Sequence, residues 1–145
     1  MDLSRSIEVF NPEVLNDEVH IIGVGATGSF VLQTLIRFGV KKINIWDFDK
    51  YEAHNVNNQA IRQDCCEKQK ATAQVELCKE INPEVEIIAH DQLVTEKDIA
   101  EMSGYVFLLV DSMKCRKELF EAIKKNDKIV WYWESRLGSD QGRVY

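Results

Sequence analysis

The sequence predicts an α/β fold in which a mostly parallel sheet carries helices on both faces. Five short segments rich in β-branched and aromatic residues alternate with segments whose apolar residues recur at helical spacing. Several of the strand-like segments are apolar at successive positions, which is typical of strands covered on both faces. A glycine-rich turn follows the first of them. This order is that of an open, doubly wound, Rossmann-like sheet.

The predicted strands are short runs bounded by glycine, aspartate or lysine. They cover residues 18–24, 42–48, 85–90, 105–110 and 128–133. In the last strand Trp131 and Trp133 lie on one side, and we expect them in the core, the alternative being a groove for a partner's tail.

Helical spacing marks the segments between these strands. The first predicted helix follows the glycines and ends at Gly39, and a second covers residues 71–81. The sequence "TEKD" at 95–98 has the form of a capping box and predicts the start of a short helix. A last helix contains residues 119–123. Length and composition, 145 residues of which 45% are hydrophobic, predict one domain.

The net charge, the absence of targeting signals and the cysteine pattern indicate which kinds of partner and which cellular location to expect. The net charge of −6 argues against nonspecific nucleic-acid binding, which needs a basic face. The sequence has neither a signal-peptide pattern at its start nor an apolar run of 18 residues, so we expect a cytoplasmic protein without a membrane partner. The four cysteines form no CxxC pair and are expected to be reduced thiols. Cys78 and Cys115 are expected at helix positions that face a core, and Cys65 and Cys66 on an exposed loop.

Three glycines, Gly23, Gly25 and Gly28, stand in GxGxxG register between the first strand and the first helix. In this motif the first glycine permits the tight turn, the second lets the backbone approach a phosphate, and the third lets the helix pack on the strand. The helix N-terminus then offers free N–H groups to an anion. The motif therefore predicts nucleotide binding, against the alternative of a plain strand-to-helix turn.

Two acidic residues, Asp47 and Asp49, follow the second strand. A carboxylate about 20 residues beyond the glycines can accept hydrogen bonds from ribose hydroxyls, in ATP as well as in NAD. A dehydrogenase then proceeds into an ordinary crossover helix. Here a long polar segment follows instead, within residues 47–87, which favours a different class of nucleotide-binding protein.

Six short motifs occur in the order found in one family of ATP-dependent enzymes. They are "GVGATG", "DFD", "NVNNQ", "KQKA", "INP" and "DSMKCR", and together they cover residues 20–116. In this order they resemble the ThiF/MoeB family, the activators of ubiquitin-like proteins and of bacterial sulfur-carrier proteins. The resemblance implies that residues 1–145 form a single nucleotide-binding domain, or the N-terminal part of a longer family member. In the family the last nucleotide-domain strand leads into a glycine-containing turn and another strand, so the resemblance also implies that Arg136 and Gly138 lie in that turn and that a strand begins close to Tyr145.

The resemblance implies roles for individual residues. Asp47 would bind the ribose, Asn55 would lie near the phosphates, and Lys70 would neutralise phosphate charge. Asp111 would hold a magnesium ion, and Mg²⁺ does prefer one or two carboxylates together with phosphate oxygens. The alternative for Asp111 is a helix N-cap. The expected catalytic residues are Lys70, Asp111 and Arg5, and the expected nucleotide-binding residues are Gly23, Gly25, Gly28, Asp47, Asp49, Asn55, Asn58, Gln59 and Lys70.

The chain departs from the family pattern near the phosphates. Asn58 stands where the family has an arginine, so a positive charge is missing, and Arg62 or Lys68 are candidates to replace it. Gln69 replaces a proline. Family members lend an arginine across a dimer interface, and Arg5 is the candidate for that task.

The predicted function is adenylation, with ATP and Mg²⁺, of the C-terminal carboxylate of a ubiquitin-like or sulfur-carrier protein. We expect a homodimer or pairing with a related subunit. Two alternatives stay open: a noncatalytic partner subunit of the same fold, indicated by Asn58, and an NAD-binding redox domain, supported by the glycines and Asp47 alone.

Overall fold

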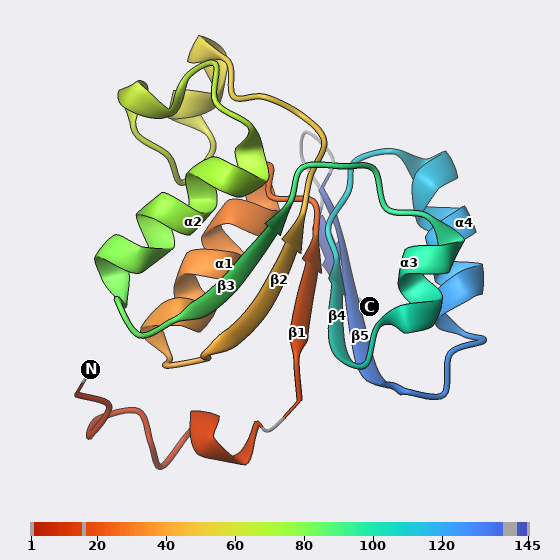
Figure 1. The fold of residues 1–145 in the computed structure, drawn as a ribbon, viewed down its shortest axis with the longest axis horizontal. Helices are drawn as coiled ribbons and strands as arrows, with labels where there is room; N and C mark the ends of the chain where they lie inside the picture. The colour runs from red at the N-terminus through yellow and green to blue at the C-terminus, as the bar shows by residue number, and fades with distance from the viewer. Residues whose placement is uncertain (1, 16, 138–141, 145) are drawn as a thin grey trace.

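The computed structural model describes residues 2–15, 17–137 and 142–144, and within them the backbone forms one six-stranded sheet (Figure 1). The strands are β1 Val19–Ile22, β2 Lys42–Trp46, β3 Glu86–His90, β4 Gly104–Leu108, β5 Ile129–Leu137 and β6 Gly142–Val144. Their order in the sheet is β3-β2-β1-β4-β5-β6. All neighbours pair in parallel except β5 and β6, which are antiparallel. The predicted Rossmann-like, mostly parallel sheet is therefore confirmed.

Helices connect the parallel strands as the sequence predicts. They are α1 Ala26–Arg37, α2 Lys70–Ile81, α3 Glu96–Glu101 and α4 Met113–Ile123, with short 3₁₀ turns η1 Pro12–Val14, η2 Ala53–Asn57 and η3 Gln63–Cys65. The predicted capping box is present: the Thr95 side chain accepts a hydrogen bond from Asp98 N–H, and the Asp98 carboxylate accepts one from Thr95 N–H. α1 ends just before Gly39, whose φ of +86° reverses the chain.

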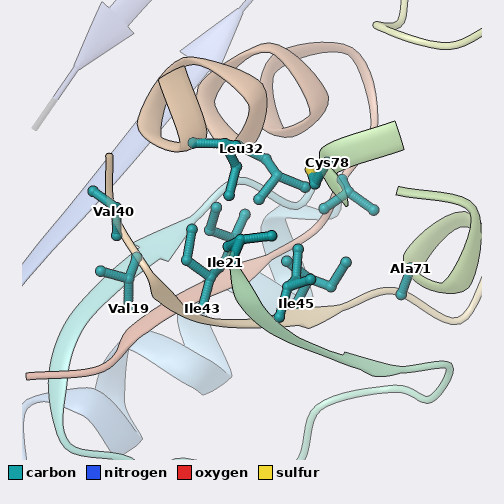
Figure 2. Close-up of a cluster of buried hydrophobic side chains, with 12 residues drawn as sticks. Val19, Ile21, Leu32, Val40, Ile43, Ile45, Ala71 and Cys78 are labelled. Atoms are coloured by element: carbon teal, nitrogen blue, oxygen red, sulfur yellow. The ribbon is translucent and has the colours of Figure 1, made fainter. Parts of the chain in front are cut away.

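Both faces of the sheet are packed against helices. One cluster of buried side chains, which includes Ile21, Ile43 and Ile45, lies beneath Leu32 of α1 and Cys78 of α2 (Figure 2). A second cluster joins the opposite face to α3 and α4. Alternate residues of each strand therefore enter different cores, which explains the apolar runs in the sequence. Among the described residues, no helix is long and apolar enough to cross a membrane.

Two sequence predictions about the last strand are wrong. β5 continues to Leu137, so Arg136 lies in the strand and not in the predicted turn, while Gly138 lies outside the described residues. Trp131 is 63% exposed, not a core residue. Trp133 is half-buried and stacks on Phe107, with ring centroids 4.9 Å apart. The reason is visible in Figure 1: α1 and α2 lie over β1 to β3 and leave this side of β5 without a helix.

The cysteines also differ in part from their prediction. All four are free, and Cys78 is a core residue as expected. Cys65 is buried against Leu77 of α2, although we expected it on an exposed loop, because the polar crossover segment folds back onto that helix. Cys66 is half-buried. Cys115 of α4 is half-buried and packs against the second buried cluster, so it faces a core as expected, and it also lines the cavity described below.

Candidate functional site

A cavity of about 980 Å³ opens at the carboxyl ends of β1, β2 and β4. These ends meet at the point where the sheet order reverses between β1 and β4, which is where open α/β sheets bind ligands. The cavity is closed at the sides by the β3–α3 loop and by the first turns of α4. Its lining includes seven of the predicted site residues: Gly23, Gly25, Asp47, Asp49, Gln59, Lys70 and Asp111.

Each of the three glycines is favoured at its position for a different structural reason. Gly23 has a φ of +92°, and a Cβ there would lie 3.0 Å from the backbone of Leu109. A Cβ on Gly28 would lie 1.9 Å from the carbonyl oxygen of Gly23, so Gly28 serves the packing of α1 on β1 and does not line the cavity. A Cβ on Gly25 would meet nothing within 4 Å. Gly25 therefore leaves open space beside the backbone on the cavity side, as a bound phosphate requires.

The start of α1 faces this open space. Gly25 is the N-cap, and no side chain caps the helix. The first N–H groups of a helix have no intrahelical partners and carry a partial positive charge, which together suit an anion. Gly25, Ala26 and Thr27 all line the cavity. The turn thus has the geometry that a phosphate-binding loop needs.

Asp47 fixes the loop beside the glycines. Its Oδ2 accepts a hydrogen bond from Val24 N–H at 2.9 Å, and its Oδ1 accepts one from Asp49 N–H at 2.9 Å. Burial raises the pKa of Asp47, while those two backbone hydrogen bonds oppose the shift. Each carboxylate oxygen has a second lone pair, so Asp47 can also accept from a ligand hydroxyl.

Lys70 reaches the cavity from the first turn of α2. Its side chain is 11% exposed and its Nζ lies 3.2 Å from Oδ2 of Asp49. The ammonium group also lies 5.9 Å from the ring centroid of Tyr51, a buried residue of the crossover segment. The start of α2 is capped from outside by Asp91, which accepts from Thr72 N–H at 3.1 Å. Lys70 therefore contributes its side-chain charge, and the α2 N-terminus is already occupied.

Gln59 brings an unsatisfied polar atom to the cavity. Its side chain is part of the lining, the residue is 9% exposed, and Oε1 has no hydrogen-bond partner among the described residues. A buried amide oxygen without a partner costs about 1–3 kcal/mol, so a ligand donor at this point would be favoured. Asn55 is buried behind it and accepts from Glu52 N–H at 2.9 Å. Asn55 and the exposed Asn58 do not line the cavity.

Asp111 stands exposed at the rim, between β4 and α4. The N-cap of α4 is Ser112, whose Oγ accepts from Cys115 N–H at 3.3 Å, so the N-cap alternative for Asp111 is wrong. Within the described residues, no three His, Cys, Asp or Glu side chains converge as a metal site. The residues present fit a magnesium ion held by Asp111 together with phosphate oxygens of a nucleotide, in keeping with the preferences of Mg²⁺.

The basic residues considered as substitutes lie elsewhere. Arg62 pairs with Asp64 and Glu80, and Lys68 pairs with Glu76 at 2.7 Å. Neither lines the cavity. Arg5 is exposed in the N-terminal segment, which runs below the amino ends of the strands in Figure 1, away from the cavity of its own chain.

Sequence reasoning missed a buried ion pair in the cavity wall. Arg116 of α4 lies 3.9 Å from Glu134 of β5, and its Nη1 donates to Leu108 O at 3.4 Å. Arg116 lines the cavity and adds positive charge to its wall. Glu134 alternates with Trp133 along the strand and so faces the opposite side, which is the one available signal that it is buried near α4.

Comparison with known proteins supports the resemblance. The model of the ThiF family matches residues 5–138. The ubiquitin-like modifier-activating enzyme 5 of Drosophila pseudoobscura pseudoobscura is 35% identical over 99 residues, which are 68% of this chain and 25% of that protein. The chain thus spans about a quarter of the length of the curated relatives it matches.

Solved structures share the fold. The E. coli tRNA N6-threonylcarbamoyladenosine dehydratase TcdA, in complex with ATP, superposes with a TM-score of 0.79 at 24% identity, over 89% of this chain and 56% of that one. E. coli MccB, crystallised with AMPCPP and MccA, gives a TM-score of 0.81 at 18% identity, over 92% of this chain and 42% of that one. With a family model that matches almost its whole length, the chain belongs to the ThiF family.

Proposed function

We propose that this chain binds ATP and Mg²⁺ and adenylates the C-terminal carboxylate of a ubiquitin-like or sulfur-carrier protein. The observation that carries the proposal is the cavity itself. It combines an uncapped helix start, an open space at Gly25, the Lys70 side chain and carboxylates from two strand ends. Relatives named as modifier-activating enzymes, and a structural neighbour titled as a complex with ATP, support the same ligand. Residues 1–145 would then form one nucleotide-binding domain.

Each lining group has a place in this proposal. Asp47 accepts from the ribose hydroxyls, and the N–H groups at the start of α1 donate to the phosphates. Lys70 exchanges its ion pair with Asp49 for the phosphate charge. Gln59 accepts a hydrogen bond from the ligand at its unpaired Oε1. Asp111 would hold Mg²⁺, which neutralises charge on the phosphates when it is bound.

The reaction needs positioning and charge stabilisation more than a protein nucleophile. A carboxylate oxygen of the carrier attacks the α-phosphorus of ATP. The bond from that phosphorus to the bridging oxygen of the β-phosphate breaks, which yields an acyl-adenylate and pyrophosphate. Lys70 and the helix N-terminus stabilise the charge that develops on the phosphates. Arg116, which is buried and paired with Glu134, bounds the same space.

Exchange of labelled pyrophosphate into ATP tests this function. We expect exchange that depends on Mg²⁺ and on a carrier protein with an intact C-terminus. A carrier truncated by its last residue is the matched control and should support no exchange. Exchange that is equal with both carriers, or binding of ATP without any exchange across a panel of such carriers, would contradict the catalytic proposal.

A noncatalytic partner subunit is the second candidate, because Asn58 stands where the family has an arginine and neither Arg62 nor Lys68 reaches the cavity. We also propose that the chain forms a homodimer or pairs with a related subunit through the uncovered side of β4 and β5. The rings there are Tyr105, Phe107, Trp131 and Trp133. In such a pair Arg5 of one copy would reach the cavity of the other.

Sedimentation of the wild type and of Trp131→Asp tests the pairing. We expect a dimer that the charged variant converts to a monomer, and a monomeric wild type at high protein concentration would contradict it. An NAD-binding domain is the least supported candidate, since it rests on features that ATP-binding members share. A cytoplasmic location is proposed from the four free cysteines and the use of ATP.

A further inference from the structure

Tyr51 lies directly behind the glycine loop without lining the cavity. Its side chain is fully buried. Its hydroxyl donates a hydrogen bond to Val24 O at 3.3 Å and accepts one from Gln74 Nε2 at 2.8 Å. Burial raises the pKa of Tyr51 well above its usual range, so the hydroxyl keeps its proton and remains a donor. The crossover segment thus sends one buried hydroxyl to the back of the loop.

The bond to Val24 fixes the direction of the next N–H. Val24 C=O and Gly25 N–H belong to one peptide unit, which is planar and trans, so the two groups point in opposite directions. The Val24 N–H is held separately by Asp47. Because Tyr51 holds the carbonyl on the side away from the cavity, the Gly25 N–H is turned toward the cavity that Gly25 lines.

A chain of hydrogen bonds connects the Tyr51 hydroxyl to α2, to the segment after Gln59 and to α1. Gln74 belongs to α2, the helix whose first residue is Lys70, and its Nε2 also donates to Ala60 O at 3.2 Å. Ala60 follows Gln59 directly, and its N–H donates to the buried Ser29 Oγ of α1 at 2.9 Å. A largely buried polar network of this kind is rigid and fixes one arrangement.

We propose that Tyr51 is a positioning residue, which aims the Gly25 N–H at a phosphate of the bound nucleotide and sets the glycine loop against α2. This proposal rests on the proposed nucleotide binding. The proposal limits the effect of Tyr51 to one part of the ligand. Tyr51 orients the N–H group that binds a phosphate, and it does not affect the contacts with the nucleoside. Phosphate affinity and nucleoside affinity should therefore separate when the hydroxyl is removed.

Titration of Tyr51→Phe with Mg-ATP and with adenosine, followed by ¹⁵N NMR of the full chain, tests the proposal. The variant keeps the ring beneath Lys70 and removes both hydrogen bonds. We expect ATP affinity to fall by about fivefold to tenfold, which is the range for one net hydrogen bond, with adenosine affinity unchanged. Tyr132→Phe, a half-buried tyrosine of β5 outside the lining, is the matched control and should bind both ligands as the wild type does.

A second variant keeps the test informative should Tyr51→Phe fold poorly. Gln74→Met removes the donor to the Tyr51 hydroxyl and leaves the tyrosine in place, and it should lower the ratio of ATP to adenosine affinity by a smaller factor. Equal losses for both ligands, or no loss, would overturn the positioning role. A wild type that binds neither ligand would overturn the proposed function itself, and this role with it.

Discussion

The ammonium group of Lys70 lies 3.2 Å from Oδ2 of Asp49, and this ion pair joins the two ends of the crossover segment at the mouth of the cavity. Lys70 N–H also donates to Asp49 O at 2.9 Å, and Lys50 forms an isolated bridge with Gln69 beside them. The long polar segment between β2 and α2 therefore returns to where it began. Its polar ends lie together at the cavity, and its middle packs against α2.

Replacing Lys70 should weaken ATP binding because it removes the positive side chain that comes to the cavity from α2. We expect Lys70→Gln to lower ATP affinity by at least about tenfold, or about 1.4 kcal/mol, measured by isothermal titration. Lys68→Gln removes a lysine of the same segment that is paired with Glu76 outside the lining. Equal losses in both variants would mean that overall charge, and not the position of Lys70, governs binding.

Alanine at two glycines should separate folding from binding. Gly28→Ala places a Cβ 1.9 Å from a backbone oxygen, so it should destabilise the fold by more than about 2 kcal/mol. Gly25→Ala meets no atom within 4 Å, so it should cost less stability than Gly28→Ala. Its methyl group should instead obstruct the phosphate and reduce ATP affinity. Urea unfolding and titration measure the two effects, and a stability loss in Gly25→Ala as large as that in Gly28→Ala would contradict the open space beside Gly25.

The sequence predicted the fold well because its signals are local and repeated. Apolar runs such as "HII" in β1 and the box at Thr95 each determine their own element. The glycines and strand ends also predicted five residues that line the cavity, and the family motifs predicted two more, Gln59 and Lys70. Trp131 and Cys65 were misplaced because their burial depends on which helix covers which part of the sheet. Likewise, nothing local indicates that the hydroxyl of Tyr51 faces Val24, a contact across 27 residues.

Removing the Asp111 carboxylate should abolish the effect of magnesium on ATP binding. We expect Asp111→Ala to bind ATP with an affinity that no longer rises when Mg²⁺ is added, because the proposed protein ligand is lost. Unfolding should stay cooperative, since Asp111 is exposed and does not cap α4. Asp127→Ala, an exposed carboxylate before β5, is the control. Unchanged magnesium dependence in Asp111→Ala would show that the metal assignment is wrong.

The buried His20 should make the fold sensitive to acid. Burial lowers the pKa of His20 below its ordinary 6.5, although the nearby Glu18 carboxylate opposes the shift. The unfolded chain then binds a proton more readily than the folded one, so this contribution to stability is present above pH 6.5 and is lost as pH falls toward the folded pKa. Unfolding free energies at about pH 7.5 and about pH 5.5 should differ less for His20→Gln than for the wild type. Replacement of the exposed His54 should leave the difference between the two unfolding free energies as it is in the wild type. A pH dependence in His20→Gln equal to that of the wild type would show that His20 is not the residue responsible.

Glu67 has a φ of +68°, a left-handed conformation that glycine adopts without strain. Its N–H donates to Tyr51 O at 2.8 Å, so the surrounding turn holds the residue there. We expect Glu67→Gly to stabilise the fold by about 0.5–1 kcal/mol, after the greater flexibility of unfolded glycine is subtracted from the relieved strain. Glu67→Val should destabilise it, because a β-branched side chain tolerates this conformation worst. The midpoint of urea unfolding measures the stability of both variants. A glycine variant less stable than the valine variant would show that the backbone at Glu67 is not strained.

Calorimetric titration of the chain with ATP and with NAD, each with and without Mg²⁺, tests the central claim most directly. A triphosphate bound over the glycine loop, with its sugar at Asp47 and its cation at Asp111, predicts saturable binding of ATP that magnesium strengthens and that NAD does not match. Preference for NAD, or no heat of binding for ATP under any of these conditions, would contradict the account.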